Sequence, residues 1–268
     1  MKTPRLFSTT VAQKLLPQTL GKKFQPLAMK LAAATGHQCQ VSGYPYPLMK
    51  SDSSSGGRAT PLMIEPRDTD EHGQPLSARA IQERLQKLGV TPKTVQVVCP
   101  LIYWSKHVDL AINYKRGSLI FAPWASQGEL ITLFRTLAVA DSQPKGDHHI
   151  PTLGRASEAM LVIEEEMGNH GILSEVLALP EDTEWDAQVW LDTLRRLPAR
   201  ERRIYQQRFA QHLRFWPSAD SFRPLFGYWG STAHKNPNQE DRSPTSTGNP
   251  WIKRYSTFFE QALSENSR

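Results

Sequence analysis

The chain has 268 residues, of which 39% are hydrophobic and 22% are charged, and its formal net charge is +6. This length suits one domain with extensions, or two small domains. No apolar run approaches the roughly 18 to 20 residues of a membrane helix, and the N-terminus lacks the compact apolar region of a signal peptide. We therefore expect no membrane insertion, and the presence of only two cysteines, Cys39 and Cys99, favours the reducing cytoplasm.

The first half of the chain predicts short elements separated by turns. A helix in the first 35 residues is expected to end near Gly36, since glycine suits a left-handed cap. A second helix fits residues 77–88, with Ser77 as its N-terminal cap and Gly89 at its end. Apolar and β-branched runs predict three strands, at 62–64, 95–99 and 118–121.

From residue 126 the pattern becomes helical. Ser126 and Glu129 have the spacing of a capping box, and apolar residues then recur at helical intervals. Four helices are predicted, one from 126 and the others at 153–167, at 183–196 and from Pro198 to about Phe215. We expect 217–268 to be mostly loop, with a mobile polar stretch from Ser231 to Asn249.

Two segments resemble the halves of a zinc-binding site. GHQCQVSG has the form of a knuckle that supplies two ligands as C-x-x-C before a glycine, and VQVVCPLIYWSKH stands where a second knuckle would lie. The four ligand positions are Cys39, Ser42, Cys99 and Ile102. Structural zinc is almost always four-coordinate, so we expect no cofactor and two buried cysteines. The alternative is a zinc ion completed by His37 or His107, with the His37 side chain pointing the same way as that of Cys39.

The order of these features resembles a known family. The half-knuckles are followed by Tyr114, by GSLIFAP and by a helix that begins SQGELITLF. Two further segments, Ala156 to Glu165 and WLDTLRRLPARERR, fit the same order. The chain is thus similar, over roughly residues 36–215, to DotN/IcmJ-like components of type IVB secretion and conjugation systems, including those of IncI-type conjugative plasmids.

The resemblance implies an α+β fold, in which a small degenerate treble-clef, HNH-like ββα core precedes a helical half. The implied divisions are an N-terminal extension (1–35), a degenerate zinc-finger core (36–125), a helical region (126–216) and an aromatic-rich, partly disordered tail (217–268). It also implies a non-enzymatic adaptor or scaffold that binds the type IV coupling ATPase and other transfer-complex proteins and aids substrate recruitment. Such a subunit reaches the inner membrane only through its partners.

An HNH ancestry leaves a metal-dependent endonuclease as an alternative. That chemistry needs a histidine base and a divalent ion. The candidates are His72 and His107, with Asp68 or Asp70 as a metal ligand. However, Glu65-Pro66 stands where the acid–histidine pair is expected. We therefore favour an exposed acidic turn around His72 and an ordinary helix-start position for His107.

Seven arginines and one acid, Glu201, lie between residues 195 and 214. The candidate binding residues are Arg195, Arg196, Arg200, Arg202, Arg203 and Arg208. Aromatic residues such as Tyr205 are interleaved with them. Arginine beside aromatics suits nucleic acid, as in a non-catalytic DNA-binding accessory to transfer, and equally suits an acidic peptide. The simpler alternative is a solvated helix face whose aromatic residues pack inward.

Overall fold

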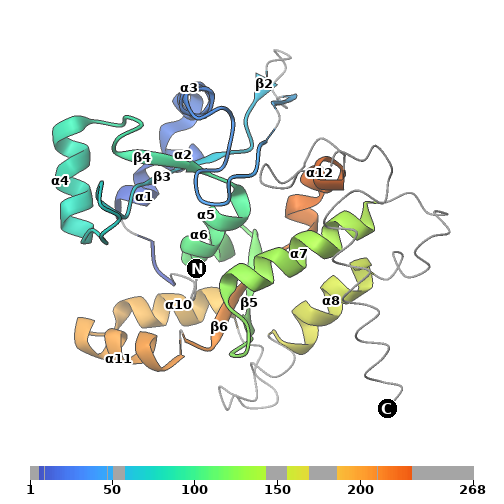
Figure 1. The fold of residues 1–268 in the computed structure, drawn as a ribbon. Helices are drawn as coiled ribbons and strands as arrows, with labels where there is room; N and C mark the ends of the chain where they lie inside the picture. The colour runs from blue at the N-terminus through green and yellow to red at the C-terminus, as the bar shows by residue number, and fades with distance from the viewer. Residues whose placement is uncertain are drawn as a thin grey trace. The chain divides into compact units, whose positions relative to one another are not determined.

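The computed structural model describes residues 6–8, 10–46, 48–50, 58–142, 156–168, 186–209 and 211–230. The chain forms two compact units, one of Ser8–Tyr103 and one of Met1–Phe7 with Trp104–Arg268. Helices predominate, and the strands of the described residues form three two-stranded antiparallel sheets (Figure 1). The predicted α+β class is confirmed. Within these residues no helix is long and apolar enough to cross a membrane.

The unit Ser8–Tyr103 begins with helices. They are α1 (Thr10–Lys14), α2 (Pro17–Leu20), the 3-10 helix η1 (Gly21–Lys23) and α3 (Phe24–Ala34). The buried residues of α3 lie on one face, at Phe24, Ala28, Leu31 and Ala32. The chain leaves α3 through a left-handed turn at Gly36 and His37, whose φ angles are 65° and 57°. The predicted helix end near Gly36 is confirmed.

Two hairpins complete this unit. The short strands β1 (Met49–Lys50) and β2 (Arg58–Ala59) form one, and β3 (Met63–Pro66) and β4 (Val95–Val98) form the other, with Met63 opposite Val98. The helix α4 (Ala78–Leu88) lies between β3 and β4 in the chain. It begins after Ser77, whose hydroxyl accepts a hydrogen bond from the Ala80 N–H, and ends at Gly89. These two strands and this helix were predicted.

Helix α5 (Pro100–Lys106) follows β4 directly and crosses from one unit into the next. The second unit then contains α6 (Val108–Asn113) and β5 (Gly117–Phe121), followed by α7 (Gln127–Asp141) and α8 (Ala156–Glu166). Its later elements are α10 (Ala187–Arg196), α11 (Ala199–Phe209), β6 (Leu213–Pro217) and α12 (Ala219–Gly230). The capping box of α7, between Ser126 and Glu129, is present as predicted.

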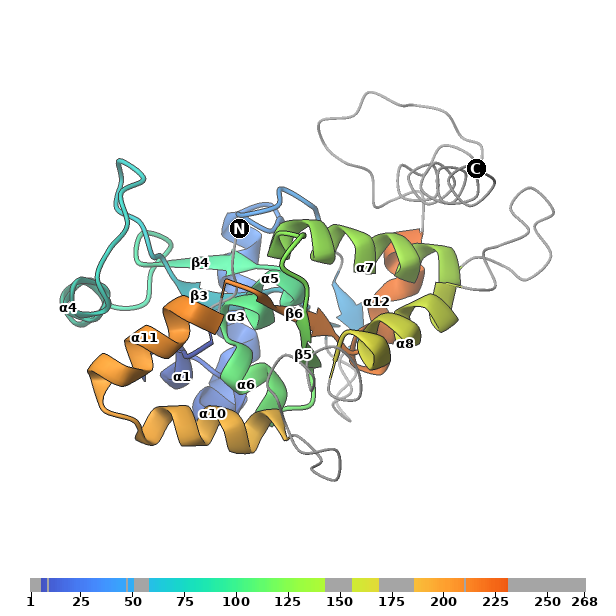
Figure 2. The same cartoon turned by 90° about the horizontal axis from the view of Figure 1, so that it is seen from below.

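An aromatic core holds the second unit together around α7. Phe134 of α7 makes edge-on contacts with Trp216 of β6 and with Phe222 and Phe226 of α12, at centroid distances of 5.5 to 6.0 Å. Strand β6 pairs with β5, with Gly117 opposite Pro217. The core therefore joins residues that lie about 100 positions apart in the chain. Helices α8 and α12 both lie beside α7 (Figure 2).

Two predictions for the C-terminal part were wrong. Residues up to Phe215 were expected to continue a helix, but Leu213–Pro217 form β6, because this bulky apolar run pairs with β5. Residues from 217 were expected to be loop, but α12 occupies Ala219–Gly230. Its buried residues, Phe222, Leu225, Phe226 and Trp229, have helical i, i+3, i+4, i+7 spacing. The stretch from Ser231 to Asn249, predicted to be mobile, lies outside the described residues.

Candidate functional site

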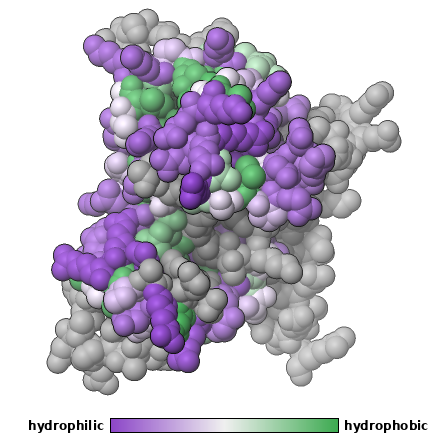
Figure 3. Space-filling model, turned by 90° about the vertical axis from the view of Figure 1, so that its left-hand side faces the viewer, coloured by the Kyte–Doolittle hydropathy of each residue, from purple (hydrophilic) through white to green (hydrophobic). Residues whose placement is uncertain are grey.

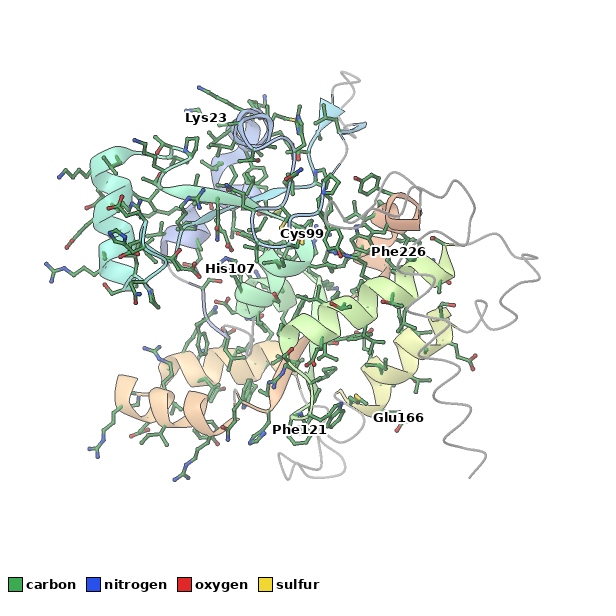
Figure 4. All side chains as sticks on the ribbon, in the orientation of Figure 1. Lys23, Cys99, His107, Phe121, Glu166 and Phe226 are labelled. Carbon is green, nitrogen blue, oxygen red and sulfur yellow. The ribbon has the colours of Figure 1, made fainter. Side chains whose placement is uncertain are left out.

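The two half-knuckles come together in the unit Ser8–Tyr103. Cys39 lies in a tight turn in which the Gly43 N–H donates to the Cys39 carbonyl oxygen over 2.7 Å. Cys99 lies between β4 and α5. The Cys99 N–H donates to the Cys39 sulfur over 3.2 Å, and the Ser42 N–H donates to the same sulfur over 3.4 Å. Both cysteines are free and fully buried, as predicted, and Cys99 is labelled in Figure 4.

The hydrogen-bond donors around Cys39 favour a negative charge on its sulfur. The pKa of its thiol is lowered to about 5, chiefly by a hydrogen bond from the Cys99 side chain. Burial acts in the opposite direction, and the backbone N–H groups of Ser42 and Cys99 lower the pKa further. These sulfur–hydrogen and nitrogen–hydrogen donors favour the thiolate form of Cys39, in the place where a metal-bound knuckle would have a zinc ion.

The residues at the four knuckle positions do not fit zinc. Cys39 and Cys99 supply two sulfurs, Ile102 supplies no donor, and Ser42 supplies only a hydroxyl, which is not among the usual ligands of zinc. His37 follows α3 in a left-handed turn, so the expected alternation with Cys39 along a strand was wrong. In the described part of the chain, no three His, Cys, Asp or Glu side chains group as metal ligands would.

The histidines considered for a nuclease have other positions. His72 lies in an exposed turn, where the Asp70 carboxylate accepts the N–H groups of His72 and Gln74, each over 2.8 Å. The His72 side chain is 78% exposed. His107 is buried at the start of α6, and the N–H groups of Leu110 and Ala111 donate to its carbonyl oxygen. Both positions agree with the simpler interpretation of the sequence.

Arg195, a candidate binding residue, takes part in the internal structure of the second unit. Its guanidinium forms an ion pair with the buried Asp109 carboxylate over 2.5 Å and with Asp192 over 2.9 Å. It also lies over the Phe7 ring, 5.7 Å from the centroid. The sequence could not reveal the Arg195–Asp109 pair, because the two residues are 86 positions apart and neither neighbourhood indicates the other.

Two further arginines contact the backbone of their own unit. Arg202 donates to the carbonyl oxygen of Arg195 over 3.3 Å, at the C-terminal end of α10. Arg214 is buried, and it donates to the carbonyl oxygens of Ala125, Gln211 and Leu213 over 2.6 to 2.8 Å. Burial lowers the pKa of the Arg214 guanidinium, and the nearby Glu129 opposes this. The side chain of Arg203 lies outside the described part of the structure.

The other candidate arginines are exposed and lie beside exposed apolar residues. Arg196 ends α10, and Arg200 and Arg208 lie on α11. Ile204 and Tyr205 lie between them on α11 and are 42% and 41% exposed. At about 100° per residue, the exposed α11 residues, among them the single acid Glu201, share one face of the helix. We call Arg200, Ile204, Tyr205 and Arg208 the basic face.

The alternative in which the aromatic residues of this region pack inward is wrong for Tyr205, which is exposed, but holds for Phe215 and Trp216, which are fully buried on β6. None of the α11 side chains whose burial is described is buried. Figure 3 views the side on which α11 projects in Figure 1, and hydrophilic residues there surround small hydrophobic areas. An exposed apolar pair flanked by arginines can bind an acidic partner that also offers apolar side chains.

No family model matches this chain, and no curated protein matches it significantly.

Proposed function

We propose that the chain is a cytoplasmic, non-catalytic adaptor subunit of a type IVB conjugative transfer complex, of the DotN/IcmJ kind. In this role it binds the coupling ATPase and helps to recruit substrates. The observation that carries the proposal is the basic face, where Ile204 and Tyr205 are exposed between Arg200 and Arg208. Burying such residues in an interface removes apolar surface from water and gives arginine the desolvated setting in which it contributes most to binding.

The arrangement around Cys39 supports the family assignment within this proposal. A tight turn with Cys39, an antiparallel hairpin of β3 and β4, and a helix that starts straight after Cys99 follow one another along the chain. This is the order of a treble-clef scaffold, with the first ligand positions in the turn and the second ones in the first helical turn. The hydrogen bonds to the Cys39 sulfur connect the two parts where a zinc ion would do so in a metal-bound relative.

An adaptor is favoured over a nuclease by the positions of the two histidines. A general base must reach the proton that it removes, beside a metal ion that stabilises the developing charge. His72 lies on an exposed turn built around Asp70, and His107 is buried at a helix start. These are structural roles that the fold itself accounts for.

A DNA-binding accessory is the second candidate. The exposed Tyr205 ring beside Arg200 and Arg208 favours it, because single-stranded DNA is bound by aromatic stacking together with arginine contacts to phosphate. In that case binding would weaken steeply as salt increases, whatever the DNA sequence.

Affinity capture tests the proposal. The tagged protein is purified from a strain that carries its transfer genes, and the recovered coupling ATPase is quantified. We expect Arg200→Glu with Arg208→Glu to reduce recovery by about tenfold or more, since one hot-spot arginine is worth about 2 kcal/mol. Lys22→Glu with Lys93→Glu is the control, because it makes the same net charge change at exposed residues of the other unit.

Two outcomes would contradict the proposal. One is wild-type protein that recovers no coupling ATPase but retains single-stranded DNA in a salt-dependent way, which supports the DNA-binding alternative. The other is cleavage of supercoiled plasmid in the presence of magnesium or manganese that is lost in His72→Ala or His107→Ala, which supports a nuclease.

A further inference from the structure

Helix α8 has an exposed apolar pair of its own. The helix packs on α7 with Ala156 and Met160 buried. Leu161 and Val162 face away from this contact and are 55% and 49% exposed. Large apolar residues exposed next to each other on an ordered helix are typical of a surface that contacts another molecule.

Glutamates surround this pair. Glu158, Glu165 and Glu166 are exposed, and at 100° per residue they lie with Leu161 and Val162 within an arc of about 140°. Glu166 lies at the C-terminal end of the helix (Figure 4). We call these five residues the acidic face. By contrast, Glu164 is partly buried and accepts a hydrogen bond from the Ser118 hydroxyl over 3.0 Å, so it does not belong to that face.

The acidic face of α8 and the basic face of α11 are complementary. Each has two apolar residues that are adjacent in the sequence, Leu161 and Val162 on one and Ile204 and Tyr205 on the other. Glutamates flank the first pair, and Arg200 and Arg208 flank the second, with Glu201 as the one acid on that face. Each helix has 11 residues, about three turns, so the two faces also match in length.

The fold keeps the two faces apart within one chain. Both helices belong to the same compact unit, and in Figures 1 and 2 they are well separated. The exposure of both apolar pairs agrees with this separation. A face that finds no complement in its own chain can find it in another copy, since every copy presents both faces.

We propose that α8 of one copy packs against α11 of a second copy. The two apolar pairs leave water together, and Glu165 and Glu166 lie opposite Arg200 and Arg208. Because each copy offers both faces, two such contacts close a two-fold dimer. The apolar areas are small and the charges lie at the rim, so the association is weak and sensitive to salt.

This inference does not rest on the proposed function, although both involve α11. A second copy and the coupling ATPase would compete for the basic face. Reversing the charge of α8 therefore removes self-association and spares capture of the ATPase, whereas reversing the charge of α11 removes both. A failure of the dimer proposal can therefore be distinguished from a failure of the proposed function.

Sedimentation of the purified protein alone tests the contact. We expect the wild-type mass to rise with concentration from 30.3 kDa towards twice that value at low salt. At about 1 M salt, where the Debye length is about 3 Å, the protein should be monomeric. Glu165→Lys with Glu166→Lys should weaken association at least tenfold without harming α8, since cations are favoured in the last turn of a helix.

Charge exchange provides the decisive comparison. Arg200→Glu with Arg208→Glu should also be monomeric, but a mixture of the two variants should associate again, because each then meets an opposite charge on both faces. The control Glu71→Lys with Glu83→Lys, which changes the same number of exposed acids in the other unit, should sediment as wild type. A wild-type protein that stays monomeric at low salt, or an α8 variant that still self-associates, would overturn the proposal.

Discussion

Cys39 is a titratable group in the unit Ser8–Tyr103. The pKa of this thiol is about 5 in the folded protein, against an ordinary value of 9.0. A depressed folded pKa contributes stability that is complete above the unfolded value and is lost as the pH falls through the folded value. The free energy of unfolding should therefore decline as the pH falls from about 9 towards about 5.

Urea unfolding over this pH range, under reducing conditions, tests the role of Cys39. Cys39→Ser should remove most of the decline, because its hydroxyl does not ionise. Cys99→Ser should retain more of it, since a serine hydroxyl can still donate to the Cys39 sulfur. An identical pH dependence in the wild type and Cys39→Ser would show that this thiol is neutral in the folded protein.

Two neighbouring arginines at the end of α10 should make very different contributions to the free energy of unfolding. Arg195→Ala removes an ion pair with the buried Asp109 carboxylate, and a hydrogen bond to a charged group contributes about 1.5 to 3 kcal/mol. Arg196 is exposed, so Arg196→Ala should change stability by no more than about 0.5 kcal/mol. Denaturant midpoints of the two variants measure this difference, and equal midpoints would mean that Arg195 acts only at the surface.

Sequence reasoning at the residue level succeeded where the cause is local. Ser77 and the Ser126–Glu129 box are helix caps, which depend on residues three positions apart. The pairing of Arg195 with Asp109 depends instead on how α10 meets α6, and no local pattern encodes it. The arginine cluster is visible in the sequence, but only the structure separates its internal members from its exposed ones.

At the level of elements, the β5–β6 ladder depends on a close approach at Gly117. A Cβ atom at this position would overlap the carbonyl oxygen of Trp216 and the ring of Phe215. Gly117→Ala should therefore destabilise the second unit by about 1 to 3 kcal/mol, as overpacking does in other proteins. Thermal unfolding followed by tryptophan fluorescence measures the effect.

Gly227 is the matched control for this substitution. It lies within α12, and a Cβ atom there would have nothing within 4 Å. Gly227→Ala should stabilise the protein by about 0.5 to 1 kcal/mol, because alanine loses less conformational freedom in a helix. If Gly117→Ala were as stable as Gly227→Ala, the strands would not be paired in the register described.

Strand β6 also explains why part of the fold escaped prediction. The Phe215 N–H and carbonyl groups both bond to the side-chain amide of Gln127, each over 2.8 Å, and β5 pairs with the same strand. Both partners lie about 90 residues away, so they leave no trace in the local pattern. Helix α12 was not predicted, although its buried residues have helical spacing; it contains Pro224, a residue that is unfavourable inside helices.

In the whole molecule, two helices of the second unit combine exposed charges with exposed apolar pairs. The second unit presents an acidic face on α8 and a basic face on α11. The first unit instead buries its chemically reactive residues, Cys39 and Cys99, in a hydrogen-bonded cluster. This division favours a protein that acts by contact with partners, and it is why we place the binding surface on α11.

Conjugative transfer directly tests whether the protein is an adaptor that works through the basic face. In a strain whose copy of the gene is deleted, plasmid transfer frequency is measured after complementation with variants of matched abundance. Wild type and Glu165→Lys with Glu166→Lys should restore transfer, whereas Arg200→Glu with Arg208→Glu should leave it reduced by tenfold or more. Undiminished transfer in the deletion strain, or full rescue by the α11 variant, would contradict an adaptor that works through the basic face.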